Sequence, residues 1–221
     1  INFWAAIEVL FPSKIEESVS RIEKIVEGMV PYITRAYVAK LSAYLLHSLK
    51  TCNKQSVDII NTIDAGDNLL DKCTALLSID EYKEKRNEIY KLFDKNPLLI
   101  NRIFYLNEKL SSADSILKLL KDHICRVSWH IRRIYGTRNL IVHSGKALPY
   151  LSILVENLHS YVDRVFDVVH SVVARADRQL SLEEIAMENK LNLREHLKFL
   201  EDNKKEQCDK TNFKKLLYGN S

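Results

Sequence analysis

Residues Ile116 to Gly145 read ILKLLKDHICRVSWHIRRIYGTRNLIVHSG, and this stretch decides the fold class. Its apolar residues recur at spacings of three and four, which places them on one face of an α-helix. The members of this apolar stripe are Ile116, Leu120, Ile124, Val127, Ile131 and Ile134. Because such a face must be buried against another element, we expect this helix at the centre of the domain.

A second, longer helix is expected to begin at Pro149, after a loop at Gly145 to Leu148. One of its faces is apolar and consists of Leu151, Leu154, Val155, Leu158, Val162, Val165, Phe166, Val169 and Val172. A loop of about four residues makes two helices antiparallel neighbours in a bundle. We therefore expect these two helices to pack against each other.

The rest of the chain is also expected to be helical. The sequence holds only five Gly and four Pro, about a third of their ordinary frequency, and no alternating β-branched run predicts a strand. The pattern therefore predicts an all-α fold. We expect an up-and-down helical bundle over residues 1–178, followed by a C-terminal helical extension over 179–221.

Helix-start signals and prolines set the expected boundaries. Two pairs are spaced as capping boxes, Ser13 with Glu16 and Ser181 with Glu184. Pro31 is expected to kink or break the helix that Ser13 begins. Further helices are expected over 32–49, 68–77 and 81–93 and from Pro97, with a loop in the first part of 50–80 and a charged, fraying segment over 202–215.

Composition excludes several classes of protein. A net charge of +4, from 33 basic and 29 acidic side chains, does not indicate a nucleic-acid binder, so any such signal must be local. The four cysteines stand far apart and no histidine lies at zinc-ligand spacing, so we expect reduced thiols, no disulfide framework and no metal site. No apolar run could span a bilayer and no signal peptide is seen, which favours a cytoplasmic protein without a membrane partner. Since the chain begins at Ile1 rather than Met, we expect it to be a piece of a longer protein.

The end of the central helix carries the candidate chemistry. Arg138 continues the spacing of the apolar stripe, so its charge needs an anion, either a carboxylate of the protein or a phosphate. Tyr135, Asn139 and His143 form an adjacent row at steps of four. Arg can hold a phosphate with two hydrogen bonds, and His exchanges protons near neutral pH, which together suffice for metal-free phosphodiester chemistry. Gly145 is placed to end the helix just after His143.

The residues around this motif are unusually basic. Seven basic residues and one acid lie between Lys118 and Lys146, a local excess larger than the net charge of the chain. Such a run is either the solvated face of a helix or a surface that follows a phosphate backbone. The candidate RNA-binding residues are Arg126, Arg132, Arg133 and Lys146.

The motif resembles the signature of HEPN domains. Tyr135-Gly-Thr-Arg-Asn-Leu-Ile-Val-His-Ser-Gly145 is similar to the family pattern R-N-x-x-x-H, and Phe3-Trp4-Ala5-Ala6-Ile7-Glu8-Val9-Leu10 is similar to the opening of the Apea-like branch. That branch is associated with bacterial anti-phage and abortive-infection systems. The resemblance covers residues 1 to about 178, and implies a helical bundle that often forms a dimer with both motifs in one cleft.

The resemblance also implies roles for individual residues. Active family members are metal-independent endoribonucleases that need no cofactor. Arg138 would then bind the scissile phosphate, His143 would act as general acid and base, and Asn139 would position one of them. Glu8 is the candidate partner of Arg138, and Tyr135 is a candidate for stacking on a base.

The leading hypothesis is an RNA-cleaving effector domain of a bacterial defence or toxin system. Its expected partners are RNA, a second copy of the chain, and an N-terminal sensor region or a phage-derived trigger. The alternative is a non-catalytic interaction module in which Arg138 is a buried structural cation paired with Glu8. Binding of duplex DNA by the basic helix is a third hypothesis, weakened because no helix-turn-helix spacing accompanies the charge.

Overall fold

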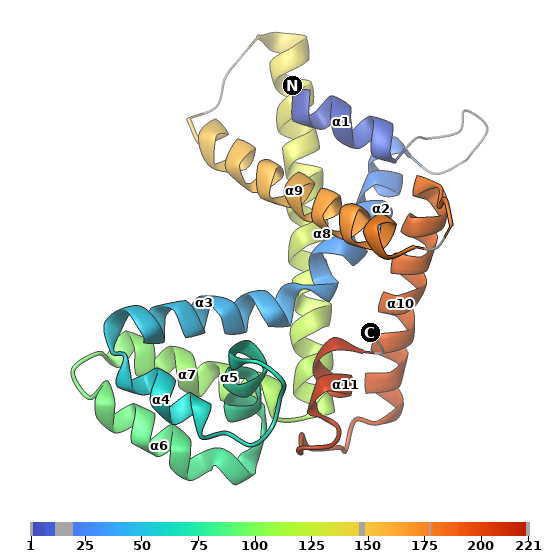
Figure 1. Cartoon of the computed structure of the whole chain (residues 1–221). Helices are drawn as coiled ribbons and strands as arrows, with labels where there is room; N and C mark the ends of the chain where they lie inside the picture. The colour runs from blue at the N-terminus through green and yellow to red at the C-terminus, as the bar shows by residue number, and fades with distance from the viewer. Residues whose placement is uncertain (1, 12–19, 146–148, 177, 220–221) are drawn as a thin grey trace. The chain divides into compact units, whose positions relative to one another are not determined.

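The structure is a computed structural model that describes residues 2–11, 20–145, 149–176 and 178–219 (Figure 1). Within these ranges it contains eleven α-helices, one 3-10 helix and no strand, so the predicted all-α fold is confirmed. The helices are α1 (Asn2–Leu10), α2 (Arg21–Arg35), α3 (Tyr37–Cys52), α4 (Gln55–Asn61), α5 (Leu69–Ser78), η1 (Asp80–Tyr82), α6 (Lys83–Leu92), α7 (Pro97–Leu110), α8 (Ala113–Ser144), α9 (Leu151–Arg175), α10 (Leu182–Asp202) and α11 (Phe213–Tyr218).

The chain divides into two compact units, each assembled from two stretches of sequence. Unit 1 consists of residues 1–35 and 122–193, and unit 2 consists of residues 36–121 and 194–221. This division differs from the expected boundary at residue 178. The reason lies in α10, whose residue Ile185 is buried in the core of unit 1 while Leu200 is buried in the core of unit 2.

Unit 1 contains the two helices expected at the centre of the domain. Val127, Ile131 and Ile134 of α8 pack in one cluster with Leu154, Leu158 and Val162 of α9, as the apolar stripes predict. The same cluster contains Trp4 and Ile7 of α1 and Ile25 and Met29 of α2. A second cluster, of Tyr32, Val165 and Ile185, joins α2, α9 and the first half of α10.

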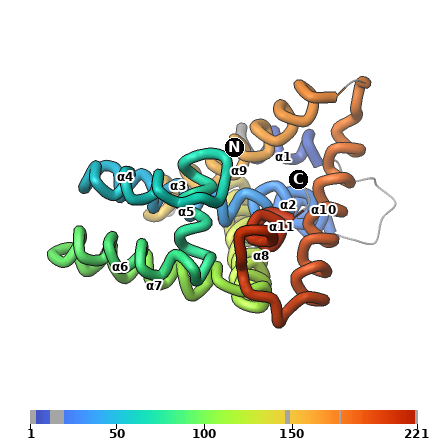
Figure 2. Tube along the Cα trace, turned by 60° about the horizontal axis from the view of Figure 1, so that its bottom comes forward, coloured from blue at the N-terminus to red at the C-terminus, as the bar shows by residue number. Residues whose placement is uncertain are grey.

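Unit 2 packs short helices around its own core. Helices α3 to α7, the first part of α8, the end of α10 and α11 all contribute buried residues to it (Figure 2). The segment 202–215, expected to fray, is instead held in place. Phe213, Leu216 and Leu217 are buried, and the Cys208 amide N–H donates to the carbonyl of Ser111 at 2.8 Å.

Several expected helix boundaries can be compared directly. The capping box at Ser181 is confirmed, because Glu184 N–H donates to Ser181 Oγ at 3.1 Å and Ser181 N–H donates to Glu184 Oε2 at 2.8 Å. Pro31 lies inside α2, and the break falls at Ala36 instead. The residues on both sides of Pro31 are buried, so packing holds the helix across the lost hydrogen bond. The pair Ser13 and Glu16 lies outside the described residues.

A buried cation stabilises unit 2. The side chain of Arg86 is almost fully buried, and its Nη1 donates to the carbonyls of Leu76 and Ile79, each at 2.7 Å. The Leu76 carbonyl lies in the last turn of α5, where helix carbonyls lack an intrahelical donor, and the Ile79 carbonyl just after it also accepts from the Tyr82 N–H at 3.3 Å. Asp80, at 3.4 Å from Nη2, balances the charge. Arg86 therefore joins the end of α5 to the next helix with charge-assisted hydrogen bonds.

We expect Arg86→Met to lower the free energy of unfolding by about 2–4 kcal/mol, since hydrogen bonds to a charged group contribute about 1.5–3 kcal/mol each and the Leu76 carbonyl loses its donor. Urea denaturation measures the change. Lys85→Met is the matched control, because Lys85 lies beside Arg86 on the same helix, is only half-buried, and forms its ion pair with Glu88 three residues on. Equal unfolding midpoints for the two variants would contradict the role of Arg86.

Candidate functional site

The motif lies in the last two turns of α8, in unit 1. The buried stripe continues through Thr137 and half-buried Ile141, so Arg138 lies at the edge of the core rather than in its middle. Asn139 is also half-buried, whereas His143 is exposed. The helix ends as predicted, because Gly145 adopts a φ of +67°, in the left-handed region, and its N–H donates to the carbonyl of Ile141 at 2.9 Å.

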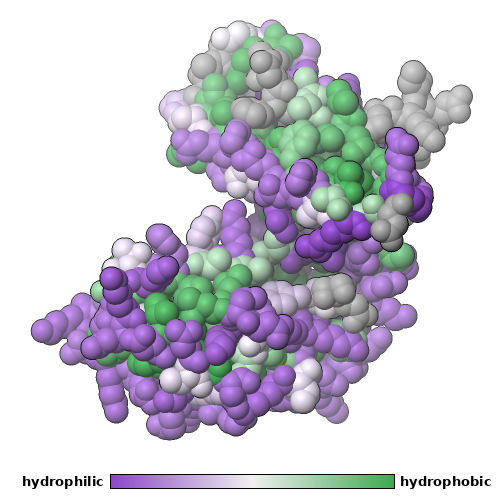
Figure 3. Space-filling view, viewed as in Figure 1, coloured by the Kyte–Doolittle hydropathy of each residue, from purple (hydrophilic) through white to green (hydrophobic). Residues whose placement is uncertain are grey.

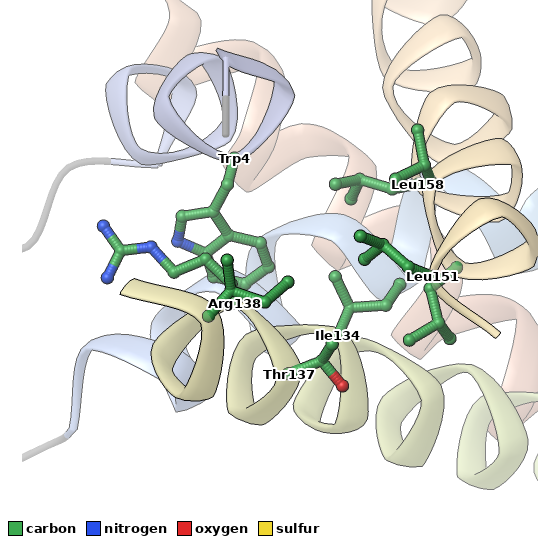
Figure 4. Close-up of a pocket in the computed structure, with 9 residues that line it drawn as sticks. Trp4, Ile134, Thr137, Arg138, Leu151 and Leu158 are labelled. Carbon is green, nitrogen blue, oxygen red and sulfur yellow. The ribbon is translucent and has the colours of Figure 1, made fainter. Parts of the chain in front are cut away.

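Arg138 is held by the amide next to it. Its Nη1 donates to Asn139 Oδ1 at 3.0 Å, and its Nε is buried without a hydrogen-bond acceptor. No carboxylate of the described residues forms an ion pair with it. Figure 4 shows the side chain passing close to Trp4, with the guanidinium pointing away from the leucines of α9. The bond to Asn139 therefore draws the charge toward the helix face that also carries His143.

Glu8 does not take the partner that was expected for it. Its carboxylate accepts a hydrogen bond from Trp4 Nε1 at 2.8 Å and pairs with Arg21 at 3.1 Å. Trp4 lies one turn earlier on the same helix and Arg21 begins α2, so both carboxylate oxygens are used within reach of α1. Arg138 consequently keeps its charge without a protein counter-ion among the described residues.

Tyr135 supports the core beside the motif. Its ring packs on that of Trp4 with a centroid distance of 5.3 Å and an interplanar angle of 38°. One face of the Tyr135 ring is covered in this way, and the residue as a whole is half-buried.

A small apolar cavity of about 60 Å³ adjoins Arg138. It lies between α1, α8 and α9 and is lined by Trp4, Ile134, Thr137, Arg138, Ile141, Leu151, Leu154, Val155 and Leu158 (Figure 4). Its walls are almost entirely hydrocarbon, so the cavity offers space to an apolar group and few hydrogen bonds.

The four predicted RNA-binding residues are in different situations. Arg132 forms a two-pronged ion pair with Glu23, at 2.8 and 2.6 Å, and this hydrogen bonding lowers the pKa of Glu23. The Nε of Arg126 donates to the carbonyl of Asp122 at 3.3 Å. Arg133 lies against aromatic rings. Lys146 lies outside the described residues.

The aromatic contacts of Arg133 reveal a residue that sequence reasoning missed. The guanidinium carbon lies 5.9 Å from the ring centre of Trp129 and 4.7 Å from that of Tyr150. Trp129 is 63% exposed, whereas Trp4 is buried. The helical spacing predicts this exposure, because Trp129 lies about 200° around the helix from both Val127 and Ile131 of the buried stripe.

No group of three or more His, Cys, Asp or Glu side chains suited to a metal ion occurs in the described part of the chain. None of the described helices is long and apolar enough to cross a membrane. Cys52 and Cys125 are exposed and Cys73 and Cys208 are buried, each as a free thiol. Burial raises the pKa of the Cys73 thiol to about 12, which keeps it protonated and unreactive.

Comparison of the chain with protein-family models, curated proteins and solved structures gives no match. The resemblance to HEPN domains therefore rests on the two sequence motifs alone.

His130, the residue after Trp129 on α8, has a shifted pKa. Its Nδ1 lies 2.9 Å from the hydroxyl of Tyr161, and the two rings meet edge to face at 5.7 Å. Burial lowers the pKa of His130, and the positive charge of Arg133 lowers it further. The folded protein therefore binds a proton at this position less readily than the unfolded chain does.

We expect this pKa shift to make unfolding depend on pH. The contribution of neutral His130 is complete above the unfolded-state pKa of about 6.5 and is lost as the pH falls through that value toward the lower pKa of the folded state. Between pH 8 and pH 5, His130→Phe should lose less stability than the unmodified protein in urea denaturation. Parallel pH profiles would show that His130 does not contribute.

Proposed function

We propose that the chain is a metal-independent endoribonuclease and the effector domain of a bacterial defence or toxin system. The observation that carries this proposal is the state of Arg138. Its guanidinium is held by Asn139 and has no carboxylate partner among the described residues, and Asn139 and His143 lie four residues apart on one face of α8. A cation fixed in this way at the edge of the core is suited to bind a phosphate.

In the proposed reaction Arg138 neutralises the scissile phosphate. His143 accepts the proton of the ribose 2′-OH as the O2′–P bond forms, and the P–O5′ bond breaks as the leaving O5′ receives a proton. The products are a 2′,3′-cyclic phosphate and a 5′-hydroxyl end. Exposure of His143 supports this role, because both the substrate and the protons must reach its ring.

Trp129, Arg133 and Tyr150 support a single-stranded substrate. An exposed indole beside a guanidinium offers a nucleobase a flat surface and a phosphate a positive charge. Base stacking on an aromatic ring tolerates any sequence, and this mode is typical of proteins that bind single strands. The substrate strand would therefore contact the exposed face of α8.

A dimer would complete the site. Acid and base roles in phosphodiester cleavage are most simply filled by two imidazoles, and a two-fold axis brings a second His143 without a second motif. Leu140 and Val142, inside the motif, and Ile153 on α9 are exposed apolar side chains that suit such an interface. Figure 3 shows that hydrophobic surface also extends over α9.

We expect purified protein to cleave single-stranded RNA in the presence of EDTA, and His143→Ala to lower the rate by about 10²–10⁴, the usual contribution of a general acid–base group. Arg138→Ala should abolish cleavage with near-normal melting temperature. Strict dependence on added metal would overturn the mechanism. A large fall in melting temperature for Arg138→Ala would favour the non-catalytic module instead.

The dimer has its own test. Partial recovery of activity on mixing Arg138→Ala with His143→Ala protein would support the composite dimer, and full activity of a stable monomer would exclude it.

Trp129→Ala should weaken binding of single-stranded RNA by roughly 5- to 100-fold, since one stacked base contributes about 1–3 kcal/mol. Binding is measured in the His143→Ala background, so that the RNA is not cut. Phe166→Ala is the matched control, because Phe166 is a half-exposed aromatic residue on α9. Intrinsic fluorescence gives a second measurement, since Trp4 is buried and quenching by RNA should come from Trp129. Equal affinities for the two variants would rule out this surface.

A further inference from the structure

Unit 1 holds two further arginines close to each other, Arg35 and Arg164, away from the α8 motif. Arg35 is the last residue of α2, Arg164 lies in the middle of α9, and Asn189 lies in the first half of α10. These three helices meet at the cluster of Tyr32, Val165 and Ile185 (Figure 1). Each of the three polar residues lies within about one helical turn of a member of that cluster, so the fold gathers them at one junction.

The hydrogen bonds at this junction leave donors without acceptors. Arg35 Nη1 donates to Asn189 Oδ1 at 2.8 Å. A guanidinium has only donors, so the amide must present its oxygen to Arg35 and turn its Nδ2 the other way. The side chain of Asn189 is only 3% exposed, and its Nδ2 has no acceptor. The Nε of Arg164 is likewise buried without an acceptor.

The charges of Arg35 and Arg164 are not neutralised by an ion pair within the described residues. Burial lowers the pKa of Arg35, the charge of Glu188 raises it, and the charge of Arg164 lowers it to a smaller extent. In the part of the chain that the structure describes, no carboxylate lies within ion-pair distance of Arg35 or Arg164. Two half-buried positive charges close to each other are unfavourable unless an anion joins them.

We propose that Arg35, Arg164 and Asn189 bind the phosphate group of a small ligand. A phosphate monoester carries close to two negative charges, which match the two guanidinium groups, and its oxygens accept from Arg164 Nε and Asn189 Nδ2. A carboxylate brings one charge and fewer acceptor positions. The phosphate is either free or part of a nucleotide. This site does not involve Arg138 or His143 and stands independently of the proposed cleavage.

The test is thermal unfolding of the full chain in sodium phosphate against sodium chloride at equal ionic strength and pH. A ligand at about 100 times its Kd should raise the melting temperature by several degrees, because it binds only the folded state. Adenosine monophosphate at the same concentration forms the second arm. A larger rise than with inorganic phosphate identifies a nucleotide as the ligand, and an equal rise identifies the phosphate group alone.

Two variants give results that a purely structural role would not. Arg164→Met should raise the melting temperature without phosphate, since it removes an unbalanced charge and an unpaired donor, and it should abolish the response to phosphate. Asn189→Asp places a carboxylate beside the two cations, so it should also raise the melting temperature and remove the response. Arg175→Met, an exposed change on the same helix as Arg164, should leave the response intact.

A rise with phosphate no larger than with chloride overturns the proposal, as does an undiminished rise in both Arg164→Met and Asn189→Asp. Arg138→Ala should keep the full response. If Arg138→Ala removes the response instead, phosphate binds at the α8 motif and the site at Arg35 is excluded.

Discussion

Burial of one face of α8 in the core of unit 1 is the constraint on which the candidate site depends. Val127, Ile131 and Ile134 lie in one buried cluster with residues of α1, α2 and α9, which removes their hydrocarbon from water. This contact fixes the rotation of α8 about its axis. Once that rotation is set, Thr137 continues the buried face, Arg138 lies at its edge, and Trp129 and His143 are exposed. The chemistry-bearing residues are therefore positioned by side chains that take no part in chemistry.

Three arginines of the chain illustrate how differently a partly buried charge can be satisfied. Arg86 is surrounded by oxygen atoms of its own unit, two carbonyls and a carboxylate, and its role is structural. Arg138 has one amide oxygen as acceptor, and the Nε of Arg164 is buried without an acceptor among the described residues. Leaving a buried donor unpaired costs about 1–3 kcal/mol. The positions of Arg138 and Arg164 are therefore better explained by ligand binding than by a contribution to stability. This difference separates the scaffold of the protein from its candidate binding sites.

The sequence predicted those features that depend on local spacing. The stripe on α8, the capping box at Ser181 and the end of α8 at Gly145 each follow from residues a few positions apart. Helix α4 was missed because it buries little, mainly Ser56 and Ile60, and so leaves a weak periodic signal. The ion pair of Glu8 could not be derived, since Arg21 comes from the next helix and no local spacing relates the two residues. The division into two units depends on long-range packing, which no local pattern encodes.

The left-handed residue at the end of α8 has a consequence for how this motif can vary. Gly145 fixes the point at which the helix ends, and the core fixes the rotation of the helix about its axis. The number of residues between Ile134 and Gly145 is therefore constrained at both ends. Each inserted residue would turn everything after it by about 100° around the axis. A single insertion between Arg138 and His143 would carry the imidazole off the face of Asn139, while one of three or four residues would nearly restore it. Natural variation in this segment should therefore occur in whole helical turns.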